Sequence, residues 1–272
     1  MFTTNSLQQL PFYNDILGIA QKCVQTNRAA VLLGACRSGG TILGQWLVES
    51  LAEDGAKVGG LYYQLGWDGS YSTIFKSLLR RLTSELPHHL DRDAVANSFI
   101  ESLRSVNCRL LYIDEADRAT PETLRELFRI QDLAARANHP FGILLFGHRQ
   151  PEDWVGHSEL GGGKIRYKRV IPELLSTEIT AILEEWCPSL ENLRTRFDSN
   201  ERQVRGAITL LEENGGSRVG VLEDYAVMLN AEFKKRQFSS QVIQEIIAHA
   251  DSPTQRLAPR FRQLDLALEE AA

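Results

Sequence analysis

Short apolar runs that alternate with helical segments constrain the fold of this chain more than any other feature. The runs lie at residues 29–33, 57–65, 109–113, 141–146 and 165–171. The segments between them have the apolar periodicity of helices, which are predicted at 41–52, 71–86, 93–106 and 121–137. Strands that alternate with helices form a parallel sheet joined by crossover helices. The sequence therefore predicts an α/β core over residues 1–172, with a helix at 5–26 before the first strand.

From residue 173 onward the pattern is helical only. Helices are predicted from Ser176 to the residue before Pro188 and at 199–214, 219–234 and 239–250. We therefore expect a small helical lid over residues 173–250, followed by a polar tail over residues 251–272.

The composition fits a protein of two parts. A chain of 272 residues is long enough for one large α/β domain and a small accessory one. The net charge of -5 argues against a histone-like basic coat, although a local basic stripe can still bind nucleic acid. The four cysteines form no CxxC pair, which favours reduced thiols in a cytoplasmic protein over zinc or disulfides. The N-terminus lacks the pattern of a secretion signal, and no apolar run approaches the roughly 20 residues that span a bilayer.

A glycine-rich segment, Gly34–Thr41, follows the first strand and precedes a helix; we call it the phosphate loop. The pattern that cradles phosphates at such a place is G-x-x-x-x-G-K-[ST], because glycines let backbone N–H groups wrap the phosphate and the helix start adds its dipole. Both glycines and the final threonine of the pattern are present, and this threonine would offer its hydroxyl to Mg²⁺. The candidate nucleotide-binding residues are Gly34, Arg37, Ser38, Gly39, Gly40, Thr41 and Ile42. The alternative is a glycine-rich turn without a ligand.

Gly40 stands where the pattern has lysine. That lysine places a mobile positive charge on the β- and γ-phosphates. We expect its loss to weaken nucleotide binding and to weaken hydrolysis more. Arg37 lies in the same loop, but its side chain starts from a different point, so full compensation is not expected.

Two adjacent carboxylates, Asp114 and Glu115, end the apolar run at 109–113. This is the Walker B arrangement, in which Asp114 would hold Mg²⁺ directly or through water and Glu115 would act as general base on the attacking water. Ordinary strands also end in acidic residues, so Asp114 alone would indicate little. Because the glycine loop precedes it in the right order, the sequence favours a magnesium–nucleotide site with Thr41 and Asp114 as metal-binding residues.

Two further positions are candidates for sensing the nucleotide. His148 and Gln150 follow the strand at 141–146, where a polar side chain would lie near the γ-phosphate. Arg205, on a lid helix, would fold over the nucleotide and report its state. The alternatives are a solvated histidine and an ordinary charge on a helix surface.

With these motifs the chain resembles the AAA+ regulators of DNA transposition, the TnsC, TniB and phage Mu B group. The resemblance covers about residues 5–211 and rests on 34–41, 110–118, 121–134, 142–150 and 203–211. It implies an AAA+ P-loop core with a helical lid, and ATP and Mg²⁺ as ligands. Thr41, Asp114, Glu115 and Arg205 would carry the nucleotide chemistry.

The resemblance also implies a ring or helical homo-oligomer on double-stranded DNA that works with a transposase and target-selection proteins. An arginine would reach the neighbouring subunit's site, and the candidates are Arg125, Arg129 and Arg149. Core loops would contact DNA, with candidates Lys57, Lys76, Arg80 and Arg81. Basic stretches that are further candidates to neutralise phosphates are 164–169 and the arginines at 256, 260 and 262. The basic residues 234–236 could do the same, but a favourable charge at the C-terminus of a helix is the preferred interpretation there.

Three functions remain open from the sequence. The first is a transposition regulator that binds ATP and polymerises on DNA. The second is a pseudo-ATPase adaptor, which Gly40 favours, and the third is a signalling ATPase of a defence or secretion system without DNA dependence. The retained Glu115 favours the first, because a site abandoned for hydrolysis has little need of a base.

Overall fold

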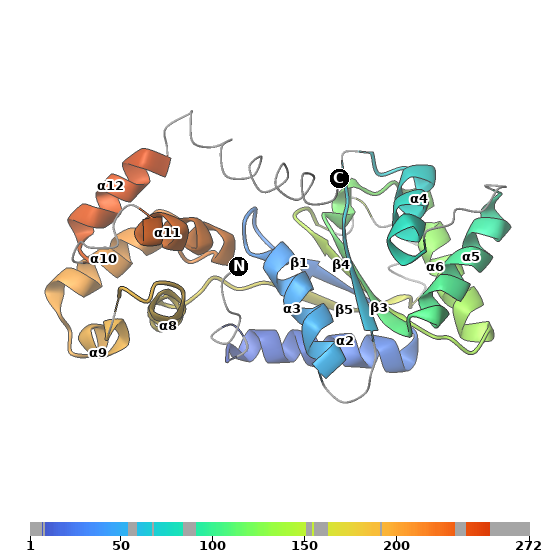
Figure 1. Cartoon of the computed structure of the whole chain (residues 1–272), viewed down its shortest axis with the longest axis horizontal. Coiled ribbons are helices and arrows are strands. Elements are labelled where there is room, and N and C mark those ends of the chain that lie inside the picture. Colours follow the sequence, from blue (N-terminus) through green and yellow to red (C-terminus); the bar gives the residue numbers. More distant parts are fainter. Residues whose placement is uncertain are drawn as a thin grey trace. The chain divides into compact units, whose positions relative to one another are not determined.

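The computed structural model describes residues 7, 9–53, 59–66, 68–83, 91–150, 154, 163–190, 192–231 and 238–250. The chain divides into two compact units, one of them Leu7–Pro172 and the other containing the residues from Glu173 onward. Figure 1 shows the helices and strands of both units, coloured along the sequence. No described helix is long and apolar enough to cross a membrane.

The first unit is built on a parallel sheet. Its described strands are β1 (Ala29–Leu33), β2 (Gly59–Gln64), β3 (Cys108–Asp114), β4 (Gly142–Gly147) and β5 (Ile165–Val170). They lie in the order β2-β3-β4-β1-β5, and every pair is parallel. The predicted α/β fold with a parallel sheet is therefore confirmed, and the predicted strands differ from the observed ones only at their ends.

Helices cover both faces of this sheet (Figure 1). Two of them, α2 (Pro11–Thr26) and α3 (Gly40–Glu53), contact one face. The other face is covered by α4 (Tyr71–Leu82), α5 (Arg92–Ser105) and α6 (Pro121–Arg136), whose apolar side chains join alternate residues of the strands in one buried cluster. This alternation follows from the two-residue period of a strand. It places Ile113 and Leu145 in that cluster, whereas Phe146 lies outside it although it is also buried.

Two predicted helix ends lie partly outside the described residues. Helix α2 begins at Pro11, where proline occupies the first turn and lacks only an N–H that the helix does not use. The predicted start at residue 5 falls among residues 1–6, which are not described. Helix α4 ends at Leu82, and the predicted end at residue 86 is likewise outside the described part.

The second unit contains helices in its described part. They are α8 (Ser176–Trp186), α9 (Leu193–Asp198), α10 (Arg202–Glu213), α11 (Val219–Ala231) and α12 (Ser240–Ala250). The predicted helix start at residue 199 is wrong, because α9 ends at Asp198 and Asn200 has a left-handed backbone (φ 59°) that interrupts the helix. Helix α9 itself was not predicted, since six residues are too few to show a periodic pattern.

Candidate nucleotide-binding site

The sheet order brings the predicted site residues to one edge. Strand β4 pairs with β3 on one side and with β1 on the other. The carboxyl ends of these parallel strands lead into Asp114, His148 and the phosphate loop. In open α/β sheets, ligands bind outside the carboxyl ends of the strands.

The phosphate loop ends in N–H groups that make no hydrogen bond within the helix that follows. Arg37 and Gly39 have left-handed backbones, with φ of 67° and 94°. The first helical hydrogen bond of α3 runs from the N–H of Leu43 to the carbonyl of Gly39 at 2.9 Å. The N–H groups of residues 40–42 precede it and, as in any first helical turn, have no partner within the helix. A helix start of this kind binds phosphate.

Thr41 and Asp114 lie in direct contact. The hydroxyl of Thr41 donates to Oδ2 of Asp114 at 2.7 Å. The hydroxyl of Tyr62 donates to the same oxygen at 2.8 Å, and the N–H of Glu115 donates to Oδ1 at 2.9 Å. Asp114 is 2% exposed, so these donors replace the water that its carboxylate would otherwise bind.

The residues present at this point fit a magnesium ion. A hydroxyl oxygen and a carboxylate oxygen within hydrogen-bond distance are the hard ligands that Mg²⁺ takes beside nucleotide phosphates. Thr41 and Asp114 would hold the ion from the helix start and the strand end. When bound, Mg²⁺ would neutralise charge on the phosphates next to it.

Glu115 is held by two neighbouring side chains. Its oxygen Oε1 accepts a hydrogen bond of 3.2 Å from Nε2 of Gln64, at the end of β2. Its Oε2 forms an ion pair with Nη2 of Arg118, one helical turn further on. The backbone of Glu115 is left-handed (φ 56°), a conformation that costs a non-glycine residue free energy and concentrates at functional sites. Glu115 thus lies next to Asp114 with both carboxylate oxygens engaged.

Two stacked tyrosines support the site, and the sequence did not point to them. The rings of Tyr62 and Tyr112 stack with centroids 5.8 Å apart, and the hydroxyl of Tyr112 donates to the carbonyl of Gly40 at 2.8 Å. Gly44 of α3 leaves room for them, because a Cβ there would lie 2.5 Å from Tyr112 and 2.7 Å from Tyr62. Burial raises the pKa of Tyr62, and the charge of Asp114 raises it further, so its hydroxyl stays a donor. The sequence offered no signal for these tyrosines, because the pairing of β2 with β3 came only from the structure.

An aromatic ring lies against the phosphate loop. Phe146 of β4 is 1% exposed, and a Cβ placed on Gly34 or on Gly40 would lie within 2.9 Å of its ring. Its edge meets the ring of His148 at a centroid distance of 5.2 Å. Ser38 is also buried, and its hydroxyl has no hydrogen-bond partner among the described residues.

His148, the candidate sensor, contacts the loop. Its Nδ1 donates to the carbonyl of Gly34 at 2.9 Å, which leaves Nε2 of a neutral ring as an acceptor. The next residue, Arg149, turns away to an ion pair of 3.2 Å with the buried carboxylate of Asp117. Gln150 is exposed.

Arg205 belongs to the second unit and is engaged there. Its Nε donates to the carbonyl of Phe197 at 3.0 Å, and its guanidinium lies 4.3 Å from the centroid of the Phe197 ring. Contact between Arg205 and a nucleotide stays a prediction.

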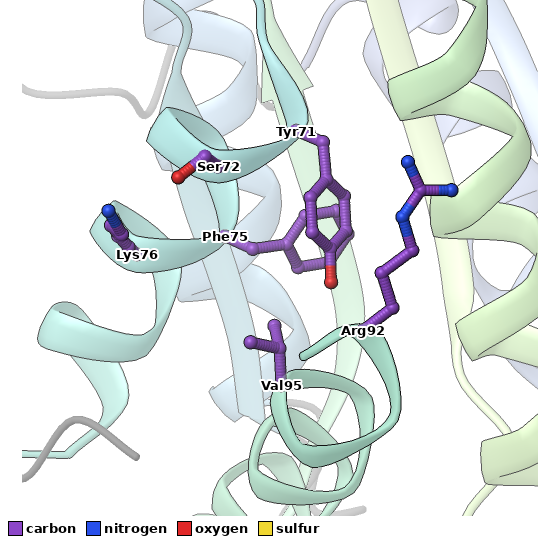
Figure 2. A pocket seen from close by; sticks show the side chains of 6 residues that line it. All are labelled: Tyr71, Ser72, Phe75, Lys76, Arg92 and Val95. Atoms are coloured by element: carbon purple, nitrogen blue, oxygen red, sulfur yellow. The ribbon is translucent and has the colours of Figure 1, made fainter. Parts of the chain in front are cut away.

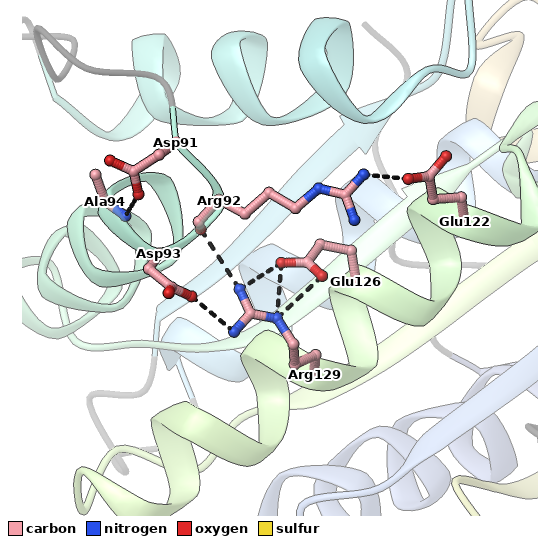
Figure 3. A network of polar contacts seen from close by, with 7 residues as sticks. All are labelled: Asp91, Arg92, Asp93, Ala94, Glu122, Glu126 and Arg129. Atoms are coloured by element: carbon pink, nitrogen blue, oxygen red, sulfur yellow. Dashed lines mark hydrogen bonds and ion pairs between the residues drawn. The ribbon is translucent and has the colours of Figure 1, made fainter.

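The candidate arginines for the neighbouring subunit differ in their surroundings. Arg129 forms a forked contact with Glu126 and a further ion pair of 3.1 Å with Asp93 (Figure 3). Arg149 pairs with Asp117. Arg125 is exposed and has no ion pair among the described residues.

A cavity of about 180 Å³ lies between α4 and α5 (Figure 2). Burial raises the pKa of Tyr71 in its wall to about 12, and the guanidinium of Arg92 lies 5.4 Å from the centroid of the Tyr71 ring. None of its lining residues belongs to the phosphate loop or to the end of β3; they are Tyr71, Ser72, Phe75, Lys76, Arg92 and Val95.

The basic residues proposed for DNA contact differ in their exposure and in their ion pairs. On the edge strand β5, Lys164 pairs with Asp132 just before the strand and Arg169 pairs with Asp15 at 3.0 Å. Further basic side chains on β5 and α4 are exposed, namely Arg166, Lys168 and Arg80. Lys57, residues 234–236 and the arginines at 256, 260 and 262 lie outside the described residues.

Comparison with known proteins agrees with this geometry. Residues 22–155 match a family model described as an AAA domain. The structure is similar to that of the Aeropyrum pernix Orc1 protein in complex with DNA, with a TM-score of 0.61, 14% identity and coverage of 89% of this chain and 66% of that one. It is also similar to Cdc6p from Pyrobaculum aerophilum (TM-score 0.53, 18% identity, 78% and 65% coverage) and to C. elegans PCH-2 (0.56, 10%, 88% and 69%).

Because the sequence identities are this low, the similarities establish the fold alone. It is the AAA+ P-loop α/β fold. The chain spans 66% of the Orc1 chain and 65% of the Cdc6p chain. No curated protein sequence matches it.

Proposed function

From the AAA+ P-loop α/β fold, we propose that this chain binds ATP with Mg²⁺ and assembles on double-stranded DNA as a regulator of DNA transposition. Phosphates would meet the N–H groups at the start of α3, and Mg²⁺ would lie between Thr41 and Asp114. The contact between these two side chains carries the proposal, because it joins the helix start to the acidic strand end.

Hydrolysis would use Glu115 as the general base. Its position next to Asp114 suits a water that attacks the terminal phosphate, but both its oxygens are engaged by Gln64 and Arg118. We propose slow turnover, because the loop lacks the lysine that would contact the phosphates.

The role on DNA is supported by three observations of different kinds. The motifs at 34–41 and 110–118 resemble those of transposition regulators, and Orc1, similar in fold, was solved in complex with DNA. Arg80, Arg166 and Lys168 are exposed and would neutralise phosphates without reading base sequence. A transposase and target-selection proteins would be the partners, in the cytoplasm.

A non-hydrolysing adaptor is the second candidate. The ring of Phe146 lies where a side chain at position 40 would begin, which favours an adaptor that neither binds nucleotide tightly nor hydrolyses it. In that case assembly alone would be the function.

One set of measurements separates these candidates. Binding of a fluorescent ATP analogue, ATP turnover and assembly on duplex DNA are measured for the natural chain and for Glu115→Gln. A regulator that hydrolyses ATP binds nucleotide, assembles on DNA only with it and loses turnover in Glu115→Gln. An adaptor shows no turnover in either protein, and a signalling ATPase turns over ATP without any effect of DNA.

A further inference from the structure

The space beside Gly40 is filled by an aromatic ring. A Cβ at this position would lie 2.3 Å from Cε1, 2.5 Å from Cδ1 and 2.6 Å from Cζ of Phe146. Real Cβ atoms essentially never approach another heavy atom within 3.0 Å. Any residue with a side chain at position 40 therefore requires the ring or the backbone to move.

The ring has little freedom to move. Phe146 lies on β4, between β3 and β1, and its register partner is Leu32. A Cβ on Gly34 would also lie 2.9 Å from the ring, so the loop borders it at two places. With 1% exposure, the side chain cannot turn into solvent without leaving a void, and voids in a close-packed interior are costly.

The backbone at position 40 is fixed as well. The hydroxyl of Tyr112 donates to the carbonyl of Gly40 at 2.8 Å. At the other end of the loop, the N–H of Gly34 donates to the carbonyl of Gly147 at 3.1 Å. A shift of the loop away from the ring would break these hydrogen bonds, and Tyr112 is buried, so its hydroxyl would be left without a partner.

We infer that Gly40 and Phe146 form a matched pair, in which the ring of Phe146 occupies the space that the first carbons of a loop lysine would need. The site is then built to meet phosphate charge through backbone N–H groups and the Mg²⁺ held by Thr41, with no lysine. The inference has two parts. The phosphate part, that the site binds phosphate without a lysine, rests on the proposed function. The packing part, that the ring of Phe146 fills the space beside Gly40, does not.

The packing part is tested by a double-mutant cycle on stability. Thermal unfolding is compared for Gly40→Ala, Phe146→Leu and the double variant. Gly18→Ala is the matched control, because Gly18 lies on helix α2 and a Cβ there meets nothing within 4 Å. Gly40→Ala should lower the unfolding temperature while Gly18→Ala does not, and the loss should shrink in the Phe146→Leu background. If Gly40→Ala is as neutral as Gly18→Ala, or if Phe146→Leu leaves its loss unchanged, the inference is wrong.

The phosphate part is tested by binding of fluorescent ADP with Mg²⁺. Gly40→Lys alone should not bind more tightly than the natural chain. Gly40→Lys combined with Phe146→Leu should bind more tightly than Phe146→Leu alone, since the lysine then has room. Tighter binding by Gly40→Lys alone, in a folded protein, would overturn the pair. Coupled stability without nucleotide binding in any variant would leave the matched pair standing and refute the proposed function.

Discussion

The hydroxyl of Thr41 donates a 2.7 Å hydrogen bond to Oδ2 of Asp114, across 73 residues of sequence. The bond joins the first turn of α3 to the end of β3. Because both oxygens are already in place, Mg²⁺ would need little rearrangement to reach them, and preorganisation of this kind lowers the cost of binding.

Thr41→Val should abolish most of the magnesium dependence of nucleotide binding. Valine keeps the shape of threonine but removes the oxygen that would contact the metal. Loss of a group that orients a metal ligand typically lowers metal affinity about 10–100-fold, so loss of a ligand should lower affinity with Mg²⁺ about tenfold or more. Titration of fluorescent ADP with Mg²⁺ and with EDTA measures this. Thr26→Val is the control, since that hydroxyl donates to the carbonyl of Lys22 on α2. Equal losses in Mg²⁺ and in EDTA would contradict a metal role.

Tyr62→Phe should weaken Mg²⁺ binding while the fold remains. The hydroxyl of Tyr62 is one of the donors that orient Asp114, and removing it leaves a nearly buried carboxylate with one partner fewer. The Mg²⁺ concentration needed for half-maximal nucleotide binding should rise. Tyr63→Phe is the control, because it changes the adjacent residue of the same strand on the opposite face. An equal shift in both variants would mean that strand packing, and not the hydroxyl, is responsible.

The sequence predicted those parts of the site that a short motif encodes. Gly34, Thr41 and Asp114 are separated by fixed spacings or end an apolar run, so their pattern alone was enough to single them out. Tyr62 and Phe146 were not predicted, because each acts through a contact between elements that no local pattern encodes.

The same difference holds for the fold. The alternation of strands and helices predicted the parallel sheet, since each element carries its own periodicity. The order of the strands, which places β4 between β3 and β1, came only from the structure. That order is what brings Phe146 against the phosphate loop.

Cys36 should report nucleotide binding through protection from alkylation. It lies in the phosphate loop and is exposed, whereas the other three cysteines are buried and burial raises the pKa of each to about 12. Iodoacetamide should therefore label Cys36 first, and Mg²⁺ with ATP should slow that labelling. Mass spectrometry of the peptide that contains Cys36 measures the rate. Unchanged labelling at saturating nucleotide would contradict binding at the loop, and Cys36→Ser identifies any labelling elsewhere.

Stability should fall above pH 9.0 because of the buried thiols. The pKa of Cys23 and that of Cys108 rise from 9.0 to about 12 on burial, so the unfolded chain loses these protons first. Their contribution to stability is complete below pH 9.0 and is lost as pH rises toward 12. The free energy of unfolding, measured in urea from pH 9.0 upward, should decline less steeply for Cys23→Ala with Cys108→Ala. An unchanged slope would show that the thiols are not the cause.

Substitution of Arg129 should lower the free energy of unfolding, whereas substitution of Arg125 should leave it nearly unchanged. Arg129 is the partner of Glu126, whose side chain is 7% exposed, so Arg129→Ala would leave a buried carboxylate without its cation (Figure 3). Arg129 itself is 38% exposed, so water offsets part of this loss, and urea unfolding should show a cost of about 1–3 kcal/mol. Arg125→Ala removes an exposed side chain and should change stability by no more than about 0.5 kcal/mol. If Arg125 reaches the neighbouring subunit's nucleotide, its loss should instead lower ATP turnover in the DNA-bound assembly and leave nucleotide binding by the separate chain unchanged. Unchanged stability of the Arg129→Ala protein would contradict the role given to Arg129. Full ATP turnover of the Arg125→Ala protein on DNA would contradict the role given to Arg125.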